Sequence, residues 1–83
     1  MKLLYFSWVR ERIGLDEENV DLPSSVKTVS DLLQWLKSRG ENYAHALEAS
    51  DVIRVALDKQ HAEPDSFIEN TQEAALFPPM TGG

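Results

Sequence analysis

Hydrophobic residues at both ends of the chain form the short, dense runs that are typical of β-strands. Residues 2–9 are mostly apolar and are followed at once by charged residues, so they predict a strand. Residues 17–22 predict a second strand, paired with the first as a hairpin after a turn at Gly14, and residues 52–57 and 73–77 predict two more. The first strand carries large side chains on both faces: Leu3, Tyr5 and Val9 on one, and Leu4, Phe6 and Trp8 on the other.

Between these strands, one segment has the periodicity of an amphipathic helix. Its apolar stripe at helical spacing consists of Val29, Leu32, Leu33 and Leu36. Thr28 is the predicted N-cap, because Asp31 follows three residues later, and Gly40 is the predicted C-cap. Residues 43–49 predict one further short helical turn.

The order strand, strand, helix, strand, strand predicts an α+β domain, in which one mixed sheet carries the main helix across one face. The first and last strands should pair in parallel, because the crossover between them is long enough. Residues 58–60 predict a turn, and residues 61–72 are polar and predict irregular structure. We expect one domain over residues 1–77 and an extended tail over residues 78–83, where two prolines interrupt the last strand.

Composition narrows the functional classes. The chain has 83 residues, a net charge of −6 and no cysteine. The acidic balance argues against nucleic-acid binding, and the lack of cysteine excludes disulfides, a thiolate nucleophile and a cysteine-based zinc site. No Lys or Arg follows Lys59, so a partner that binds this end should present a basic surface. The apolar start lacks a cleavage site and is too short to span a bilayer, so we expect a cytoplasmic protein that does not enter membranes.

Side-chain chemistry is sparse. His45 and His61 are far apart in the sequence, and no carboxylates are paired convincingly for acid–base work. No glycine-rich phosphate loop is present, because Gly14 and Gly40 stand alone. We therefore expect no metal site and no cofactor bound by this chain.

The tail is the remaining candidate. Two terminal glycines occur by chance in roughly one chain in 200. Gly82 and Gly83, however, follow a proline pair that makes a functional tail the better interpretation. Pro78 and Pro79 favour a stiff, extended path, and residues 78–83 reach roughly 20 Å when fully extended. Glycine at the tip allows the backbone to enter a channel that any Cβ would block. The reactive group would then be the Gly83 carboxylate, which becomes electrophilic only when a partner adenylates it with ATP; a sulfur donor could then convert it to a thiocarboxylate.

Residues 77–83, with the sequence Phe-Pro-Pro-Met-Thr-Gly-Gly, resemble the C-terminal signature of the small subunits of molybdopterin synthase. Residues 6–11, with Gly14 just after them, resemble that family's opening, and the likeness in length and element order covers the whole chain. The family usually has an acid–Gly–acid turn before the last strand. Here residues 70–72 read Asn-Thr-Gln, although Asn70 can still adopt a left-handed conformation.

The resemblance implies a ubiquitin-like β-grasp fold with an extended C-terminal tail. It implies that a ubiquitin-activating-type enzyme adenylates Gly83, which then becomes a thiocarboxylate. The tail, residues 78–82 with Gly83, would insert into the large synthase subunit and give its sulfur to a cyclic pterin phosphate. In the family, two small subunits flank a dimer of large subunits. The chain would be a carrier subunit of a sulfurtransferase complex, with no active site of its own.

The residues leave several alternatives open. Phe6, Trp8 and Phe77 form a candidate docking patch for a partner, but they could equally be ordinary core. The same tail could serve a sulfur carrier for thiamine synthesis, although the Phe-Pro-Pro step argues against it. It could also belong to a protein modifier whose Gly83 becomes attached to lysine, or to an interaction domain with an unreactive tail.

Overall fold

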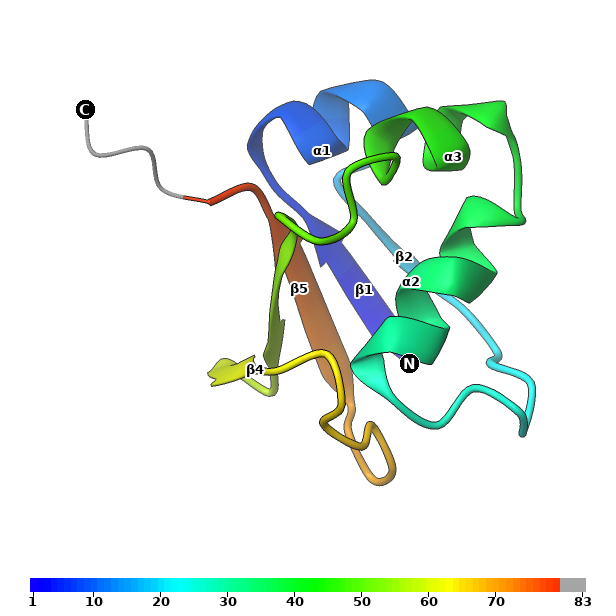
Figure 1. Cartoon of the computed structure of the whole chain (residues 1–83), viewed down its shortest axis with the longest axis vertical. Coiled ribbons are helices and arrows are strands. Elements are labelled where there is room, and N and C mark those ends of the chain that lie inside the picture. Colours follow the sequence, from blue (N-terminus) through cyan, green and yellow to red (C-terminus); the bar gives the residue numbers. More distant parts are fainter. Residues whose placement is uncertain (80–83) are drawn as a thin grey trace.

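Five strands form one mixed sheet, in which the last strand of the chain is central and the first lies directly beside it (Figure 1). This computed structural model describes residues 1–79. The strands are β1 Lys2–Tyr5, β2 Glu17–Asn19, β3 Arg54–Leu57, β4 Gln60–Ala62 and β5 Glu73–Phe77, in the spatial order β2-β1-β5-β3-β4. β1 and β5 run parallel, and every other pair is antiparallel. The predicted parallel pairing of the two terminal strands is confirmed.

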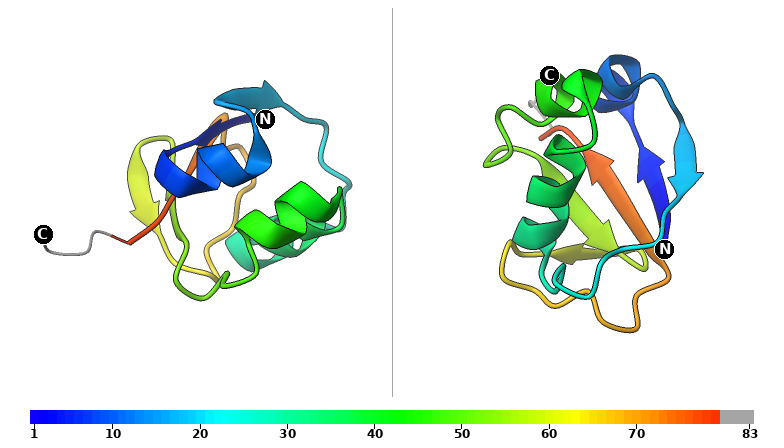
Figure 2. Two further views of the ribbon diagram at one scale, coloured as in Figure 1. Left: turned by 90° about the horizontal axis from the view of Figure 1, so that it is seen from above. Right: turned by 90° about the vertical axis from the view of Figure 1, so that its right-hand side faces the viewer.

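The helices are α1 Ser7–Ile13, α2 Val29–Lys37 and α3 Glu41–Ala46, and α2 lies across one face of the sheet (Figure 2). The predicted start of α2 is confirmed. Thr28 Oγ1 accepts from the Asp31 N–H at 3.2 Å, and the Asp31 carboxylate accepts from the Thr28 N–H at 3.2 Å. Within residues 1–79, no helix is long and apolar enough to cross a membrane.

The predicted C-cap of α2 at Gly40 is wrong. The helix ends at Lys37 with Ser38 as its C-cap, and Gly40 is instead the N-cap of α3. The Ser38 N–H and hydroxyl both donate to the Trp35 carbonyl, at 3.1 and 2.6 Å. The hydrogen bonds of this tightened last turn therefore satisfy carbonyls at the end of α2, which a glycine C-cap would otherwise satisfy.

The predicted strand over residues 2–9 is right only as far as Tyr5, because the chain turns there into α1. Ser7 has a φ of 55°, which changes the chain direction. Val9 and Ile13, one helical turn apart, are both buried, so the helix has a core-facing side. Gly14 then ends α1 in the left-handed region, with φ 93°, and its N–H donates to the Arg10 carbonyl at 2.8 Å.

The polar segment after β3 also differs from expectation. Residues 60–62 form β4, where the end of a turn and the start of an irregular segment were predicted, and a tight hairpin joins β4 to β3. Asp58 and Lys59 both have positive φ, 48° and 72°, as a two-residue hairpin turn of the primed type requires. Asn70 has the predicted left-handed conformation, with φ 65°.

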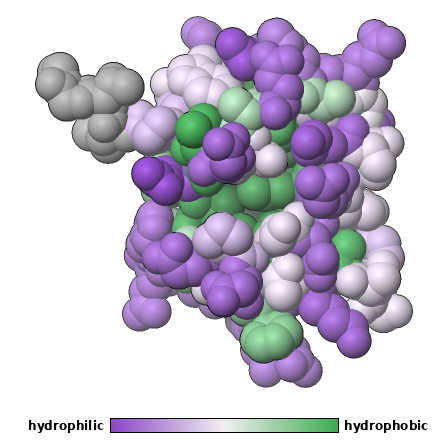
Figure 3. All heavy atoms as spheres, in the orientation of Figure 1, coloured by the Kyte–Doolittle hydropathy of each residue, from purple (hydrophilic) through white to green (hydrophobic). Residues whose placement is uncertain are grey.

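The hydrophobic core lies between the sheet and the helices. In the side view, hydrophobic atoms gather along the middle of the molecule and hydrophilic atoms surround them (Figure 3). The predicted apolar stripe of α2 is buried along its whole length. It packs in the same cluster as the inward side chains of the sheet, which include Leu3, Tyr5, Val55, Ala74 and Leu76.

One carboxylate, that of Glu18, collects three donors at the border of this core. The Tyr5 and Tyr43 hydroxyls each donate to Oε2 at 2.7 Å, and Arg39 Nη1 donates to Oε1 at 2.9 Å. The Glu18 side chain is only 14% exposed. Burial by itself raises the pKa of Glu18, but the three hydrogen bonds outweigh it and hold the pKa below its usual range. The cluster joins β1 and β2 to the segment that connects α2 with α3.

We predict that Glu18→Gln lowers the free energy of unfolding by about 2 kcal/mol at neutral pH, since hydrogen bonds to a charged group are lost. The depressed pKa of Glu18 means that this stability is present above the carboxyl's unfolded pKa and is lost as the pH falls through its folded pKa. Urea unfolding at pH 7 and at pH 3 checks this. The difference in the free energy of unfolding between wild type and Glu18→Gln should be smaller at pH 3 than at pH 7. An equal difference at the two pH values would contradict a stabilising role for the Glu18 carboxylate.

Candidate functional site

The chain leaves the sheet at the end of β5. Phe77 is the last residue of the strand, and Pro78 and Pro79 follow it with half-buried side chains. Since proline has no N–H to donate, the strand ladder cannot continue through them. The remaining predicted tail residues, Met80, Thr81, Gly82 and Gly83, lie outside the described part of the chain. The structure thus describes the residues from which the predicted tail begins.

Phe6 lies beside this exit point. Its N–H donates to the Leu76 carbonyl at 3.1 Å, so the pairing of β1 with β5 continues one residue past Tyr5. Phe6 is still extended, with φ −127° and ψ 155°, and its side chain therefore alternates with that of buried Tyr5 to the opposite face. It is 44% exposed. The structure brings Phe6 and Phe77 to the same end of the sheet.

The face of the sheet opposite α2 has an apolar centre. Register places Leu4 next to Ala75, and Ala75 next to Ala56, across three adjacent strands. Their strand neighbours Leu3, Ala74 and Val55 point the other way, into the core. We call this surface the open face and define it by Leu4, Phe6, Ala56, Ala75 and Phe77. The sequence did not indicate Ala56 and Ala75 as site residues. Strand alternation with Ala74 and Leu76, which are buried, would have placed Ala75 on the face opposite the core.

Charged and polar residues border the open face. Lys2 Nζ lies 3.3 Å from Glu17 Oε2 along its β1–β2 side. Arg54 stands opposite Phe77 in the β3–β5 register, and His61 stands opposite Ala56 at the β4 side. An apolar centre with a polar rim is the usual composition of a protein–protein contact surface.

Trp8 does not share this face. It was expected on the outward side of a strand, but it lies in α1, where it packs partly against the core. The guanidinium of Arg12 sits over its ring, 4.6 Å from the centroid. The Arg12 Nη1 also donates to the His45 carbonyl at 3.4 Å, so Trp8 belongs to the contact between α1 and α3. The predicted position of Trp8 is wrong, because helix α1 replaces the second half of the strand.

The two histidines lie in separate elements of the fold. His45 lies on α3, where its Nδ1 is 3.9 Å from the Glu48 carboxylate, and His61 lies on the far strand β4. Within this part of the chain, no three His, Asp or Glu side chains are close enough together to hold a metal ion. What the described site offers is the hydrogen-bonded end of β5, from which the predicted tail begins, and an apolar surface beside it.

Comparison with known proteins adds to this geometry. Residues 3–83 match the family model described as the ThiS family. The molybdopterin synthase sulfur carrier subunit of Haemophilus influenzae is 32% identical over 83 residues, covering 100% of this chain and 99% of that protein. The subunits of the same name from Escherichia coli and Dictyostelium discoideum are 34% and 33% identical, and the matches cover 100% and 99% of this chain and 99% and 94% of those proteins.

Solved structures agree with the fold. The putative molybdopterin converting factor subunit 1 of Pyrococcus furiosus superposes with a TM-score of 0.74 at 25% identity, over 95% of both chains. The small archaeal modifier protein 1 of Haloferax volcanii superposes with a TM-score of 0.73 at 28% identity, over 100% of this chain and 98% of that one. The mixed sheet with its helices on one face is therefore the ubiquitin-like β-grasp expected from the sequence.

We predict that the two aromatic residues before and within α1 differ in structural role. Trp8→Ala should lower the free energy of unfolding by about 2 kcal/mol, since it removes core packing and the Arg12 contact. Phe6→Ala should cost less than about 1 kcal/mol, because a large part of its side chain is already exposed. Urea denaturation of both variants measures this, and an equal loss for the two would contradict the assignment of Phe6 to an unoccupied surface.

Proposed function

Since this chain belongs to the ThiS family, we propose that it is the sulfur carrier subunit of a molybdopterin synthase. The observation that carries the proposal is the agreement, over 99–100% of the chain, with three relatives that bear this name. The arrangement around Phe77 supports it. A chain that carries a reactive group on its own terminus needs a rigid base at that end, and β5 with the proline pair supplies one.

The proposed chemistry takes place on the Gly83 carboxylate. A ubiquitin-activating-type enzyme binds ATP, and the carboxylate oxygen attacks the α-phosphorus, so that pyrophosphate leaves and an acyl adenylate forms. Sulfur at the oxidation level of sulfide, delivered by a partner, then attacks the carbonyl carbon, AMP leaves, and a thiocarboxylate remains. In the large synthase subunit, the thiocarboxylate sulfur bonds to a carbon of the cyclic pterin phosphate. Water then cleaves the acyl carbon–sulfur bond, so that the sulfur stays on the pterin and the Gly83 carboxylate is restored. Because each tail carries a single sulfur, the two sulfurs of a dithiolene need two chains that each bear a thiocarboxylate.

The partners supply the catalytic groups in this scheme. ATP and the pterin phosphate are both anionic, and this chain has a net charge of −6. The cationic side chains that hold these ligands therefore belong on the partner proteins. The role left to this chain is delivery: Pro78 and Pro79 hold the tail extended, and Gly82 keeps its end slim enough for a narrow channel.

We assign the docking of the large subunit to the open face, with Phe6 and Phe77 next to the tail. Burying this apolar centre would anchor the carrier while its tail enters the partner. We further propose an assembly of two carriers with a dimer of large subunits. The activating enzyme needs the same tail, so it must compete with the large subunit for each carrier.

A protein-modifier function is the second candidate, and the likeness to the Haloferax volcanii small archaeal modifier protein 1 favours it. Activation of Gly83 would be the same, but the acyl group would pass to a lysine amine in place of sulfur. A sulfur carrier for thiamine synthesis is the third. It would share the activation step and differ in the acceptor of the sulfur.

Intact mass spectrometry of the chain from its own cells tests the proposed chemistry. We expect a fraction in which one oxygen of the Gly83 carboxyl is replaced by sulfur. Removal of Gly83 should leave the urea midpoint unchanged and abolish sulfur transfer to the pterin precursor in the presence of the large subunit. Adducts found only on lysines would support the modifier function, and transfer that persists without Gly83 would disprove the role of the tail.

A charge on the open face should block docking. We predict that Ala75→Glu weakens binding of the large subunit at least about a hundredfold in calorimetric titration, because an unpaired carboxylate would be buried in the contact. Gln34→Glu, which places the same charge on the exposed side of α2, should bind like wild type. Phe77→Ala is a milder variant for use if Ala75→Glu does not fold. Unchanged binding by a folded Ala75→Glu or Phe77→Ala would exclude the open face.

A further inference from the structure

One cationic residue borders the open face beside the tail. Arg54 is the first residue of β3, and the β3–β5 register sets it opposite Phe77, the last residue before the prolines. The next residue, Val55, is buried in the core, so strand alternation turns the side chain of exposed Arg54 to the open face. A guanidinium is therefore carried next to the point where the chain leaves the sheet.

The side chains on this side of the sheet form rows that cross the strands. The row at the tail end holds Phe6, Phe77 and Arg54. The middle row holds Glu17, Leu4, Ala75, Ala56 and His61, and the far row holds Asn19, Lys2 and Glu73. Among these strand residues, Arg54 is therefore the one charge at the tail end, beside two aromatic side chains.

Arg54 has no acidic partner within residues 1–79. The salt bridges in this part of the chain join other side chains, and the arginines that donate hydrogen bonds there are Arg12 and Arg39. The other cation on this side of the sheet differs, since Lys2 Nζ lies 3.3 Å from Glu17 Oε2. Lys2 also stands beside Glu73 in the β1–β5 register, so its charge is already balanced.

A partner that covers the open face takes this guanidinium out of water. A guanidinium stays charged in proteins, so it cannot lose its proton in response to burial. A buried charge without a partner is strongly unfavourable. A carboxylate is the best match, because it accepts two parallel hydrogen bonds from the planar guanidinium and also neutralises it.

We infer that the large subunit presents an Asp or Glu side chain to Arg54, and that this ion pair fixes the orientation in which the carrier docks. The inference rests on the proposed function, because it takes the open face as the surface that the large subunit covers. A carrier turned on that surface would leave the guanidinium and the acid both unpaired, which disfavours other orientations.

The pair changes what the partner surface must look like. The sequence, with no Lys or Arg after Lys59, predicts a basic surface around the tail. Arg54 is distant from the tail in the sequence and comes beside it only through the pairing of β3 with β5. The large subunit should therefore be basic where the tail enters and acidic at one position beside it.

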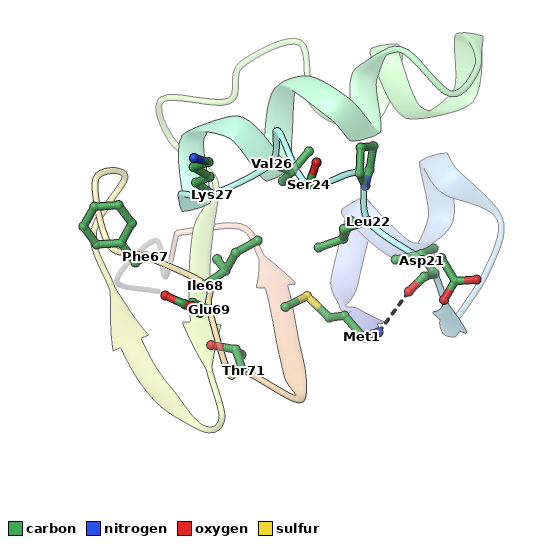
Figure 4. Close-up of a pocket in the computed structure, with 12 residues that line it drawn as sticks. Met1, Asp21, Leu22, Ser24, Val26, Lys27, Phe67, Ile68, Glu69 and Thr71 are labelled. Carbon is green, nitrogen blue, oxygen red and sulfur yellow. Dashed lines mark hydrogen bonds between the residues drawn. The ribbon is translucent and has the colours of Figure 1, made fainter.

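Charge reversal separates this arrangement from a partner surface that is basic throughout. Arg54→Glu and Lys27→Glu each replace a positive charge with a negative one, so they change the net charge equally. Lys27 is exposed at the end of the molecule where β5 begins, in the wall of a groove formed by residues 20–27 and 67–71 (Figure 4). A wholly basic partner would bind both variants more tightly than wild type.

Calorimetric titration of each variant with the large subunit from the same cells gives the answer. We expect Arg54→Glu to weaken binding at least about tenfold, because a charged hydrogen bond is lost and two carboxylates meet. Lys27→Glu should bind as tightly as wild type or more tightly. Arg54→Met keeps the apolar stem and should fall between the two, and it replaces Arg54→Glu if the urea midpoint of that variant is lowered.

Charge exchange then identifies the acid. Each exposed Asp and Glu of the large subunit is replaced in turn by Arg. One replacement should weaken binding of the wild-type carrier and restore that of Arg54→Glu, without improving the binding of Phe77→Ala, which carries no added charge.

Two failures are distinguishable. If wild type binds the large subunit but Arg54→Glu binds like Lys27→Glu, or if no replacement restores its binding, the inference is overturned and the proposed function stands. If wild type itself does not bind, the proposed function is disproved, and the inference falls with it.

Discussion

The parallel pairing of β1 with β5 is the constraint on which the rest of the structure depends. It joins residues 2–5 to residues 73–76, so nearly the whole chain must form the crossover between two adjacent strands. Closing such a loop has an entropic cost, and this cost grows only slowly with loop length. The free energy gained when the crossover packs against the sheet offsets it. Helix α2 does this on one face, and the β3–β4 hairpin extends the sheet beyond β5. The same pairing places Phe6 next to Phe77, and it thereby builds the surface beside the tail.

The elements that the sequence predicts well are those whose signals are local and strong. The start of α2 depends on Thr28 and Asp31, which bond to each other in the folded chain as their spacing implies. β5 begins and ends at the predicted residues, because charged Glu73 and the proline pair bound an apolar run. The terminal glycines need no tertiary information to be recognised as a candidate site, since the chemistry proposed for them belongs to the main chain.

The elements that the sequence did not predict take their shape from tertiary contacts. The apolar run that ends at Val9 fits a strand and a helix equally well, and only the burial of Val9 with Ile13 decides between them. β4 is a polar edge strand that is specified by its pairing with β3 rather than by its own hydrophobicity. Ala56 and Ala75 are too small to attract notice in a sequence, yet register places them at the centre of the open face. A docking surface made from alternating strand residues becomes visible only when the strand order is known.

The two edges of the sheet are short and polar, and this limits how the protein can meet other chains. β2 and β4 have three residues each, and the side chains they carry include Glu17, Asn19, Gln60 and His61. Short edge strands are poor templates for the addition of a further strand. The chain can therefore present an apolar sheet face to a partner without inviting its own copies to stack edge to edge into fibres. A partner must then be recognised by side chains on the face of the sheet, and such contacts can be specific for one partner. An unpaired strand edge, by contrast, would bind any extended peptide through main-chain hydrogen bonds.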